Sequence, residues 1–178
     1  THPVFSNAKV YYGYISCAEE AGQVYTNNEN ASETKPVHVP VAGSHTDIGG
    51  GKHSYVCDGC GSLQTENHTF KVTTGACVCG YEMAEASVTI GETTVYFLTL
   101  GDAVAEAARG TEASPATLTL RKDIDLGDKN QVISSGVFTL DLKGCTITGS
   151  GKYVLNITGG TVTIDDSGEN GAIDSTYT

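Results

Sequence analysis

The chain has 178 residues with a formal net charge of -11, and it combines 39% hydrophobic residues with 22 glycines. This length allows one or two small domains, and this composition is typical of an ordered, glycine-turned β protein rather than a disordered chain. A net-negative surface repels phosphate backbones, so we expect no nucleic-acid partner. No apolar run reaches membrane-spanning length, so we expect no membrane insertion in this segment.

Residues 1–50 predict an irregular, partly β N-terminal module. Apolar and aromatic residues favour a strand at 10–17 with a partner at 23–26. Prolines 36 and 40 favour an extended segment between them, because proline restrains the residue before it. Gly49 to Gly51 would form a flexible joint to the next module.

Residues 51–84 predict a cysteine-rich, zinc-ribbon-like module. Two close cysteine pairs, each followed by glycine, are spaced so that two tight turns could bring four thiolates together. Four thiolates suit tetrahedral Zn²⁺ and leave no coordination position open, so the predicted ion is structural. The predicted ligands are Cys57, Cys60, Cys77 and Cys79.

Two histidines and one alternative chemistry belong to the same module. His53 and His68 could replace one thiolate or support the ligands from behind, and for His53 a solvent-exposed histidine without a role is the equal alternative. Cross-paired disulfides are the alternative, since the chain looks extracellular and bridges within either close pair would be strained. We favour zinc and leave the disulfides as the alternative.

Residues 85–178 predict a β-hairpin, a short helix and the first coils of a right-handed parallel β-helix. The hairpin is expected at 88–90 and 94–97, around Gly91 and Glu92. A helix follows at 102–109, with Asp102 as its N-cap and Gly110 as its stop, and it would cover the open end of the β-helix.

A recurring apolar-alternating phrase carries the β-helix prediction. The first and second copies lie about 22 residues apart, and the second and third align at an offset of about 15. A single copy cannot bury its apolar face, whereas stacked copies can. We therefore predict coils from residue 116 onward, with the following side chains pointing inward: Leu118, Leu120, Leu140, Leu142, Ile147, Leu155, Ile157 and Val162.

The acidic residues of this region favour turns over chemistry. Asp165 and Asp166 form a pair of the kind that glycan-cleaving enzymes use, but basic companions for an acidic sugar are missing from the sequence around them. Asp bonds readily to its own backbone in turns, which is the simpler interpretation. Asp123, Asp125, Asp128 and Asp141 match no calcium loop by spacing, and solvated edges of the coils explain them better. We predict no catalytic residues and no cofactor beyond zinc.

The motif order resembles large multi-domain surface proteins of anaerobic Gram-positive bacteria of the gut Firmicutes type. Residues 88–168 carry the pectate-lyase-like β-helix part of this resemblance, through the Val-Thr-Ile-Gly hairpin, the Asp-Ala-x-Ala-Glu-Ala-Ala helix and the Leu-Asp-Leu-x-Gly-x-Thr-Ile-Thr-Gly phrase. The Cys/His part is carried by His53, Cys57, Cys60, Gly61, His68, Phe70, Gly75, Cys77, Cys79 and Gly80. The resemblance implies secretion, attachment to the cell surface or cell wall through other regions, and an adhesive or architectural role.

Together these features predict a non-catalytic extracellular module, serving as an adhesin, stalk or fibre subunit. The alternative is a fragment of a glycan-active β-helix enzyme, either a hydrolase or a lyase. The expected partner is a host or neighbouring-cell glycan or protein. Because the last predicted strand, near Ala172, shows no cover, we also expect head-to-tail self-association.

Overall fold

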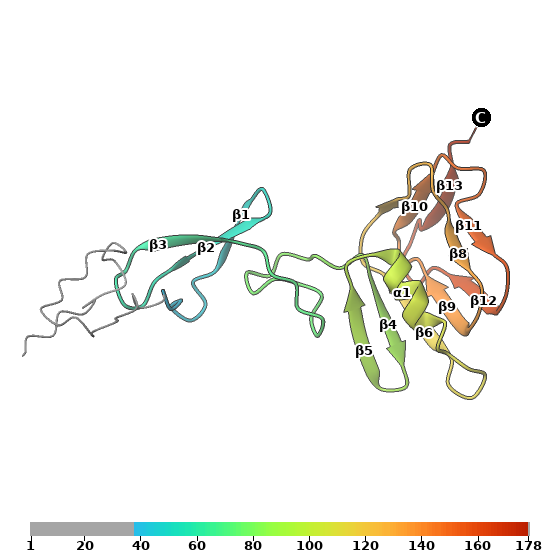
Figure 1. Cartoon of the computed structure of the whole chain (residues 1–178), viewed down its shortest axis with the longest axis horizontal. Coiled ribbons are helices and arrows are strands. Elements are labelled where there is room, and N and C mark those ends of the chain that lie inside the picture. Colours follow the sequence, from blue (N-terminus) through green and yellow to red (C-terminus); the bar gives the residue numbers. More distant parts are fainter. Residues whose placement is uncertain (1–37, 178) are drawn as a thin grey trace, which may run out of the picture. The chain divides into compact units, whose positions relative to one another are not determined.

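The computed structural model describes residues 38–177 (Figure 1). The strands predicted at 10–17 and 23–26 lie outside the described residues. The chain divides into two compact units, one ending at Asn67 and the other beginning at His68. Both are built mainly from strands, and one α-helix occurs within the described range.

The described part of the first unit is an antiparallel sheet of β1 (Thr46–Gly49), β2 (Lys52–Val56) and β3 (Leu63–Asn67), in that order. Gly49 to Gly51 all have positive φ, between 61° and 76°. Gly49 ends β1, and Gly50 and Gly51 form the turn from β1 to β2, where the sequence had predicted a joint between modules. The sheet therefore passes through the module boundary predicted at residue 50.

The second unit begins its regular structure with a hairpin of β4 (Ala86–Ile90) and β5 (Thr93–Phe97), joined at Gly91 and Glu92. Helix α1 (Leu100–Ala107) follows and packs against β4, β5 and β6 (Figure 1). Its buried face consists of Leu100, Ala103, Val104 and Ala107.

The N-cap of α1 differs from the prediction. The hydroxyl oxygen of Thr99 accepts a hydrogen bond from the Asp102 amide at 3.1 Å, so Thr99 is the cap and Asp102 lies in the first turn. The N-cap accordingly lies three residues before the predicted one. Asp102 still interacts favourably there, because an acidic side chain complements the partial positive charge of a helix N-terminus.

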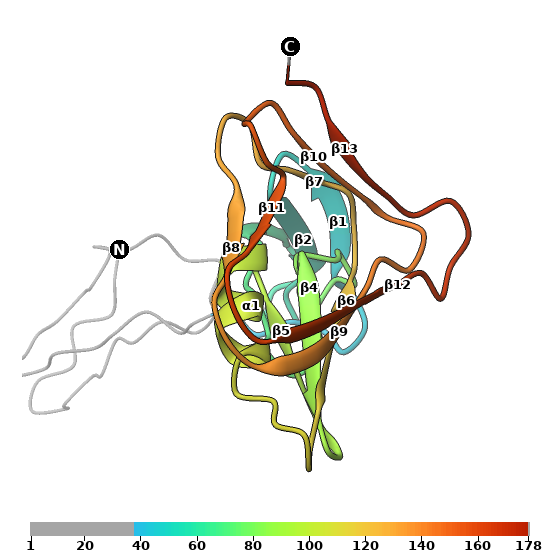
Figure 2. The same cartoon turned by 90° about the vertical axis from the view of Figure 1, so that its right-hand side faces the viewer.

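Eight short strands follow the helix. They are β6 (Ala116–Leu120), β7 (Ile124–Asp125), β8 (Gln131–Ile133), β9 (Val137–Asp141), β10 (Thr146–Gly149), β11 (Leu155–Ile157), β12 (Thr161–Asp165) and β13 (Ala172–Ser175). They join three sheets with the orders β12-β9-β6-β4-β5, β13-β10-β7 and β11-β8. Figure 2 shows the neighbours β6, β9 and β12 side by side.

The predicted fold class, a right-handed parallel β-helix start, is wrong. The strands of the described residues lie in four separate sheets, and none of these sheets closes on itself or continues as a solenoid. The largest sheet is mixed: β6 pairs in parallel with β9 on one side and antiparallel with β4 on the other. The alternation of apolar and polar residues predicts where strands form and which face of each strand is apolar. It does not predict which strands share a sheet.

The register also corrects the repeat offset of the third copy. Leu118 pairs with Leu140, as the offset of about 22 predicts. Leu140 then pairs with Ile164, and Leu155 pairs with Gln131 in a different sheet, so the offset of about 15 is wrong. The segments at Leu140 and Leu155 both alternate an apolar residue with Asp or Asn, and this shared alternation is why the two copies align by sequence.

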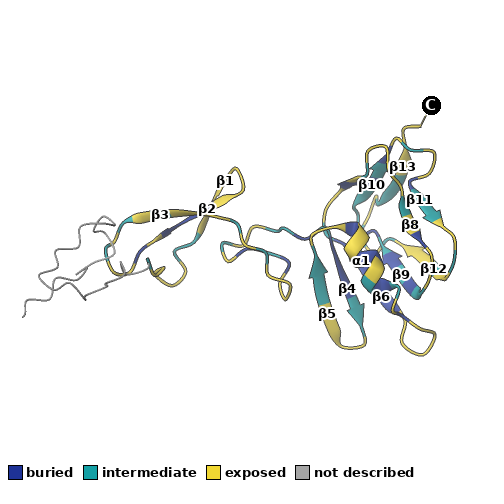
Figure 3. Ribbon diagram, viewed as in Figure 1, coloured by how far each residue is buried: buried dark blue, intermediate teal, exposed yellow. Residues whose placement is uncertain are grey.

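The core of the second unit lies between α1 and the strands, as the dark blue segments of Figure 3 show. Of the residues predicted to point inward, Leu118, Leu120, Leu140, Leu142 and Ile147 are buried. Two others, Leu155 and Val162, are partly buried against the core. Ile157 is 46% exposed, so its predicted inward position is wrong.

Candidate metal site

The first cysteine pair occupies a tight turn directly after β2. Cys57 donates its amide hydrogen to the Ser62 carbonyl at 2.9 Å, and its own carbonyl accepts from the Gly61 amide at 2.8 Å. Gly61 has a φ of 69°, a conformation that glycine adopts at no steric cost. Cys57 is buried and Cys60 half-buried, and the closed turn places both sulfurs together.

His38, which no motif of the sequence identifies, lies beside these two cysteines. His38 Nδ1 lies 3.7 Å from Cys60 Sγ. One donor atom each from His38, Cys57 and Cys60 lies within 4.8 Å of the other two, which is close enough to hold one metal ion. The Cys57 side chain, acting as a hydrogen-bond acceptor, raises the pKa of His38, and burial opposes this effect.

Backbone contacts place His38 beside the turn. The Asp58 amide donates to the Val39 carbonyl at 2.8 Å, and Pro40 pairs with Cys57 in an isolated antiparallel bridge. In the sequence, Pro36 and Pro40 were the one hint of this arrangement, because prolines favour an extended backbone, which can pair with a neighbouring segment. No pattern in the sequence connected His38 to the distant cysteines.

The second cysteine pair forms a similar turn in the second unit. The Cys77 amide donates to the Tyr81 carbonyl, and the Cys77 carbonyl accepts from the Gly80 amide, both at 2.9 Å. The Thr69 amide donates to Cys77 Sγ at 3.5 Å. Burial alone would raise the pKa of Cys77, but amide donors from Cys79, Thr69 and Val78 outweigh it and the pKa is lowered.

His68 lies alongside this second turn. Its ring stacks on Tyr81 with centroids 4.5 Å apart, and both Tyr81 and the adjacent Thr69 bond to Cys77. His53 is 2% exposed on β2, with its ring 5.2 Å from that of His45. The structure thus contains Cys/His donors close enough for a metal ion, while the predicted set of all four cysteines around one ion stays a prediction.

The second turn is tied firmly to its own unit. Arg121 forms an ion pair with Glu82 at 2.8 Å, and its guanidinium lies over the Tyr96 ring at 5.6 Å. The Tyr96 amide donates to the Val72 carbonyl at 3.0 Å. Glu82 raises the pKa of Arg121, as expected for a charge-assisted pair.

Asp165 and Asp166 both accept hydrogen bonds from backbone amides. Asp166 accepts from the amides of Gly144 at 2.6 Å and Gly171 at 2.8 Å, and Asp165 accepts from the Asp166 amide at 2.9 Å. Asp123 likewise accepts from the Thr146 amide at 2.8 Å. The Asp165 contact is local, as the turn interpretation of the acidic pair expects, whereas Asp166 and Asp123 accept from amides 22 and 23 residues away in the sequence.

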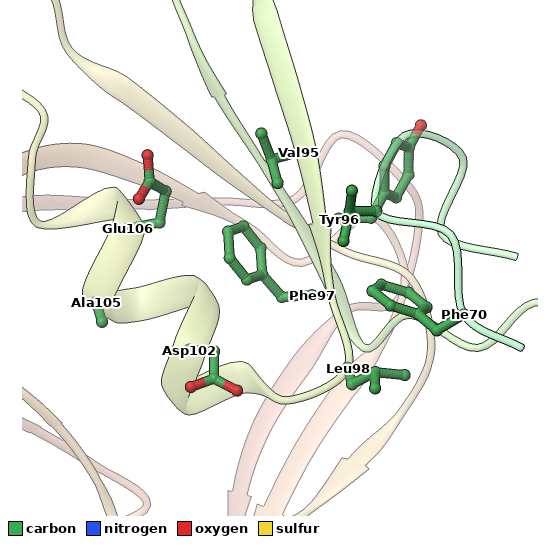
Figure 4. A pocket seen from close by; sticks show the side chains of 9 residues that line it. Phe70, Val95, Tyr96, Phe97, Leu98, Asp102, Ala105 and Glu106 are labelled. Atoms are coloured by element: carbon green, nitrogen blue, oxygen red, sulfur yellow. The ribbon is translucent and has the colours of Figure 1, made fainter.

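A shallow hollow of about 460 Å³ lies beside α1 in the second unit (Figure 4). Phe70 and Tyr96 line one side, and Asp102 and Glu106 of α1 line the other. Both carboxylates already have local partners: Asp102 accepts from the Thr99 hydroxyl at 2.7 Å, and Glu106 pairs with Arg109 at 2.7 Å. The hollow therefore offers aromatic surface more than reactive groups.

Comparison with curated proteins gives a similarity to a flagellar rod protein. No family model matches the chain, and no solved structure matches it. Among curated proteins, the chain is 32% identical over 118 residues to the flagellar basal-body rod protein FlgG of Bacillus subtilis (strain 168). The match covers 60% of this chain and spans 44% of the length of that relative. Within residues 38–177, no helix combines the length and apolarity needed to cross a bilayer.

Proposed function

We propose that the chain is a non-catalytic structural module of an extracellular, surface-attached bacterial protein, with Zn²⁺ as a structural ion of its cysteine module. The observation that carries the non-catalytic part is the use of Asp166 as a double acceptor for backbone amides. A general acid needs a carboxyl group that is free to exchange a proton with substrate. Asp166 instead holds two turns together.

The similarity to a flagellar rod protein supports a structural role at the cell surface, because that relative is named as a component of a basal-body rod. The parallel strand pairs support the same role. In the mixed sheet, β6 pairs along its length with β9, and β9 pairs along its length with β12, which gives a stiff framework. We expect a glycan or protein of a host or neighbouring cell as partner.

The enzymatic alternative is tested by incubating the full chain with acidic and neutral polysaccharides. We expect no release of reducing ends and no unsaturated products. Product release that Asp165→Asn abolishes would overturn the non-catalytic assignment. A glycan and mucin array then separates an adhesive module, which binds, from a passive spacer, which does not.

The zinc part keeps the predicted donors Cys57, Cys60, Cys77 and Cys79, with His68 as a further candidate, and it is supported by the close approach of Cys57 and Cys60 to His38. Protein purified without chelator should contain zinc, and removing it should lower the unfolding temperature, because ligand binding to the folded state adds to its stability. Mass shifts that show two disulfides and no metal would contradict this proposal in favour of the alternative.

A further inference from the structure

We infer that residues 38–67 bind a metal ion of their own, held by His38 Nδ1, Cys57 Sγ and Cys60 Sγ, with no contribution from Cys77 or Cys79. This inference rests on the proposed zinc-binding role and replaces the single four-cysteine ligand set, for this first unit, by His38, Cys57 and Cys60. It adds His38, which no cysteine spacing identifies. It also makes the first unit a metal-binding unit in its own right.

The distances fit ligands of a common tetrahedral ion. Bonds of about 2.3 Å from zinc to sulfur and about 2.0–2.1 Å to nitrogen, at tetrahedral angles, put the two donor atoms about 3.6 Å apart. His38 Nδ1 and Cys60 Sγ are 3.7 Å apart. The third donor, Cys57, lies within the same 4.8 Å group.

A hydrogen-bond chain behind Cys60 supports a thiolate there. Gln64 Nε2 donates to Ser62 Oγ at 2.7 Å. Ser62 Oγ lies 2.9 Å from Cys60 Sγ, and because its oxygen already accepts from Gln64, its hydroxyl hydrogen can point at the sulfur. Donors of this kind behind a ligand orient it and stabilise its charge.

The donor set selects the class of metal. Two thiolates and one imidazole suit a borderline-soft divalent ion such as Zn²⁺, whereas Ca²⁺ and Mg²⁺ require oxygen ligands. Three donors leave one of four tetrahedral positions for water or another group. Cys60 and His38 are half-exposed while Cys57 is buried, so the ion can enter from the solvent side.

The test is a Co²⁺ titration of the full chain carrying both Cys77→Ser and Cys79→Ser, here called the double variant. Binding is monitored by the absorbance of the thiolate-to-metal charge-transfer bands and the ligand-field bands. We expect one equivalent of Co²⁺ in tetrahedral sites, displaced by Zn²⁺. Adding His38→Gln should weaken binding at least tenfold, and adding Ser62→Ala should weaken it by about tenfold. His45→Ala and Cys145→Ser, made separately in the same background, are the matched controls and should bind as the parent does.

The outcomes separate this inference from the zinc role. Metal binding by the unchanged chain that disappears in the double variant, with its strand signal in circular dichroism retained, overturns the independent site and leaves the zinc role standing. An unchanged chain that binds no Co²⁺ or Zn²⁺ overturns both. As a second variant, His38→Gln in the otherwise unchanged chain should lower the amount of bound metal; unaltered binding there also overturns the assignment of His38.

Discussion

Asp141 shows how a single carboxylate connects neighbouring turns of the second unit. It accepts from the Lys143 amide at 3.0 Å, from the Ser167 amide at 2.8 Å and from the Ser167 hydroxyl at 2.7 Å. Lys143 is close in sequence, whereas Ser167 lies beyond β12. The same side chain therefore closes its own turn and secures the next one.

Removing this carboxylate should destabilise the second unit. Asp141→Ala leaves two amides and a hydroxyl without their acceptor, and we expect a loss of about 1–3 kcal/mol in the free energy of unfolding. Asp128→Ala, at an exposed turn position, is the control and should change stability by less than about 0.5 kcal/mol. Urea denaturation measures both, and equal effects would contradict the role of Asp141.

The same carboxylate makes stability depend on pH. Burial raises the pKa of Asp141, but the amide and hydroxyl of Ser167 and the Lys143 amide outweigh this, so the pKa is below its usual value. A folded-state pKa below the unfolded value of about 3.9 means that Asp141 stabilises the fold above about pH 4, and that this contribution is lost as pH falls through the folded pKa.

We therefore expect the unfolding free energy to fall on acidification below about pH 4, and to fall less steeply in Asp141→Asn, which cannot be protonated in this range. Circular dichroism during an acid titration measures the two slopes. Parallel curves for the two proteins would show that other groups control the acid sensitivity.

Strand β6 is the central element of the second unit. It lies between β4 and β9 in the five-stranded sheet, and α1 packs against it. Leu118 at its centre is fully buried, pairing with Val88 on one side and Leu140 on the other. A side chain in this position contacts the hairpin and the parallel strands at once.

Truncating Leu118 should be costly. Leu118→Ala removes buried methyl groups and leaves a cavity between fixed strands, so we expect a loss of about 2–5 kcal/mol. Ile157→Ala, on a half-exposed strand residue, should cost well under about 1 kcal/mol. Thermal unfolding by calorimetry compares them, and similar losses would show that the core is not centred on β6.

The start of α1 depends on Thr99. Its hydroxyl accepts from the Asp102 amide and donates to the Asp102 carboxylate at 2.7 Å, so the two side chains and one amide form a closed cap. Thr99→Ala should destabilise the second unit by about 1 kcal/mol, and Thr99→Ser should restore most of this because serine caps equally well. Chemical denaturation of both variants measures the difference; a serine variant as weak as alanine would point to packing of the Thr99 methyl group.

At the scale of the whole molecule, the second unit presents several sheet edges. β11, β12 and β13 are the outer strands of three sheets, and all three come from residues 155–175. Ile157 and Ile164 on these strands are 46% and 48% exposed. Unpaired strand edges with apolar side chains are ready templates for another strand.

We therefore expect concentration-dependent self-association through the β12 edge of the five-stranded sheet. Ile164→Lys should shift the equilibrium toward monomer, since an edge lysine opposes strand addition. Thr93→Lys, on the other edge of the same sheet, is the matched control and should associate as the unchanged chain does. Light scattering after size exclusion reports the mass; a monomer at all concentrations would rule out self-association.

The amino-acid sequence by itself determined the local features of this protein. The alternation of apolar residues located the hairpin and most buried leucines, because side chains on a strand alternate between its two faces whatever sheet it joins. The two cysteine turns, each ending in glycine, could also be predicted, because the cysteines of each turn are close together in the sequence. The turn preference of Asp anticipated the local bond between Asp165 and the Asp166 amide, whereas the bond from the Gly144 amide to Asp166 depends on the folded chain.

The tertiary structure alone decided which distant segments meet. It placed Leu155 beside Gln131 instead of Leu140, divided the strands among separate sheets, and brought His38 to the turn of Cys57 and Cys60. Several registers satisfy the same period-2 pattern, and the choice among them depends on which apolar faces are buried together in the folded chain. A metal ligand separated from its partners by a folded hairpin leaves no periodic trace in the sequence, because its position depends on backbone pairing that forms only in the folded chain.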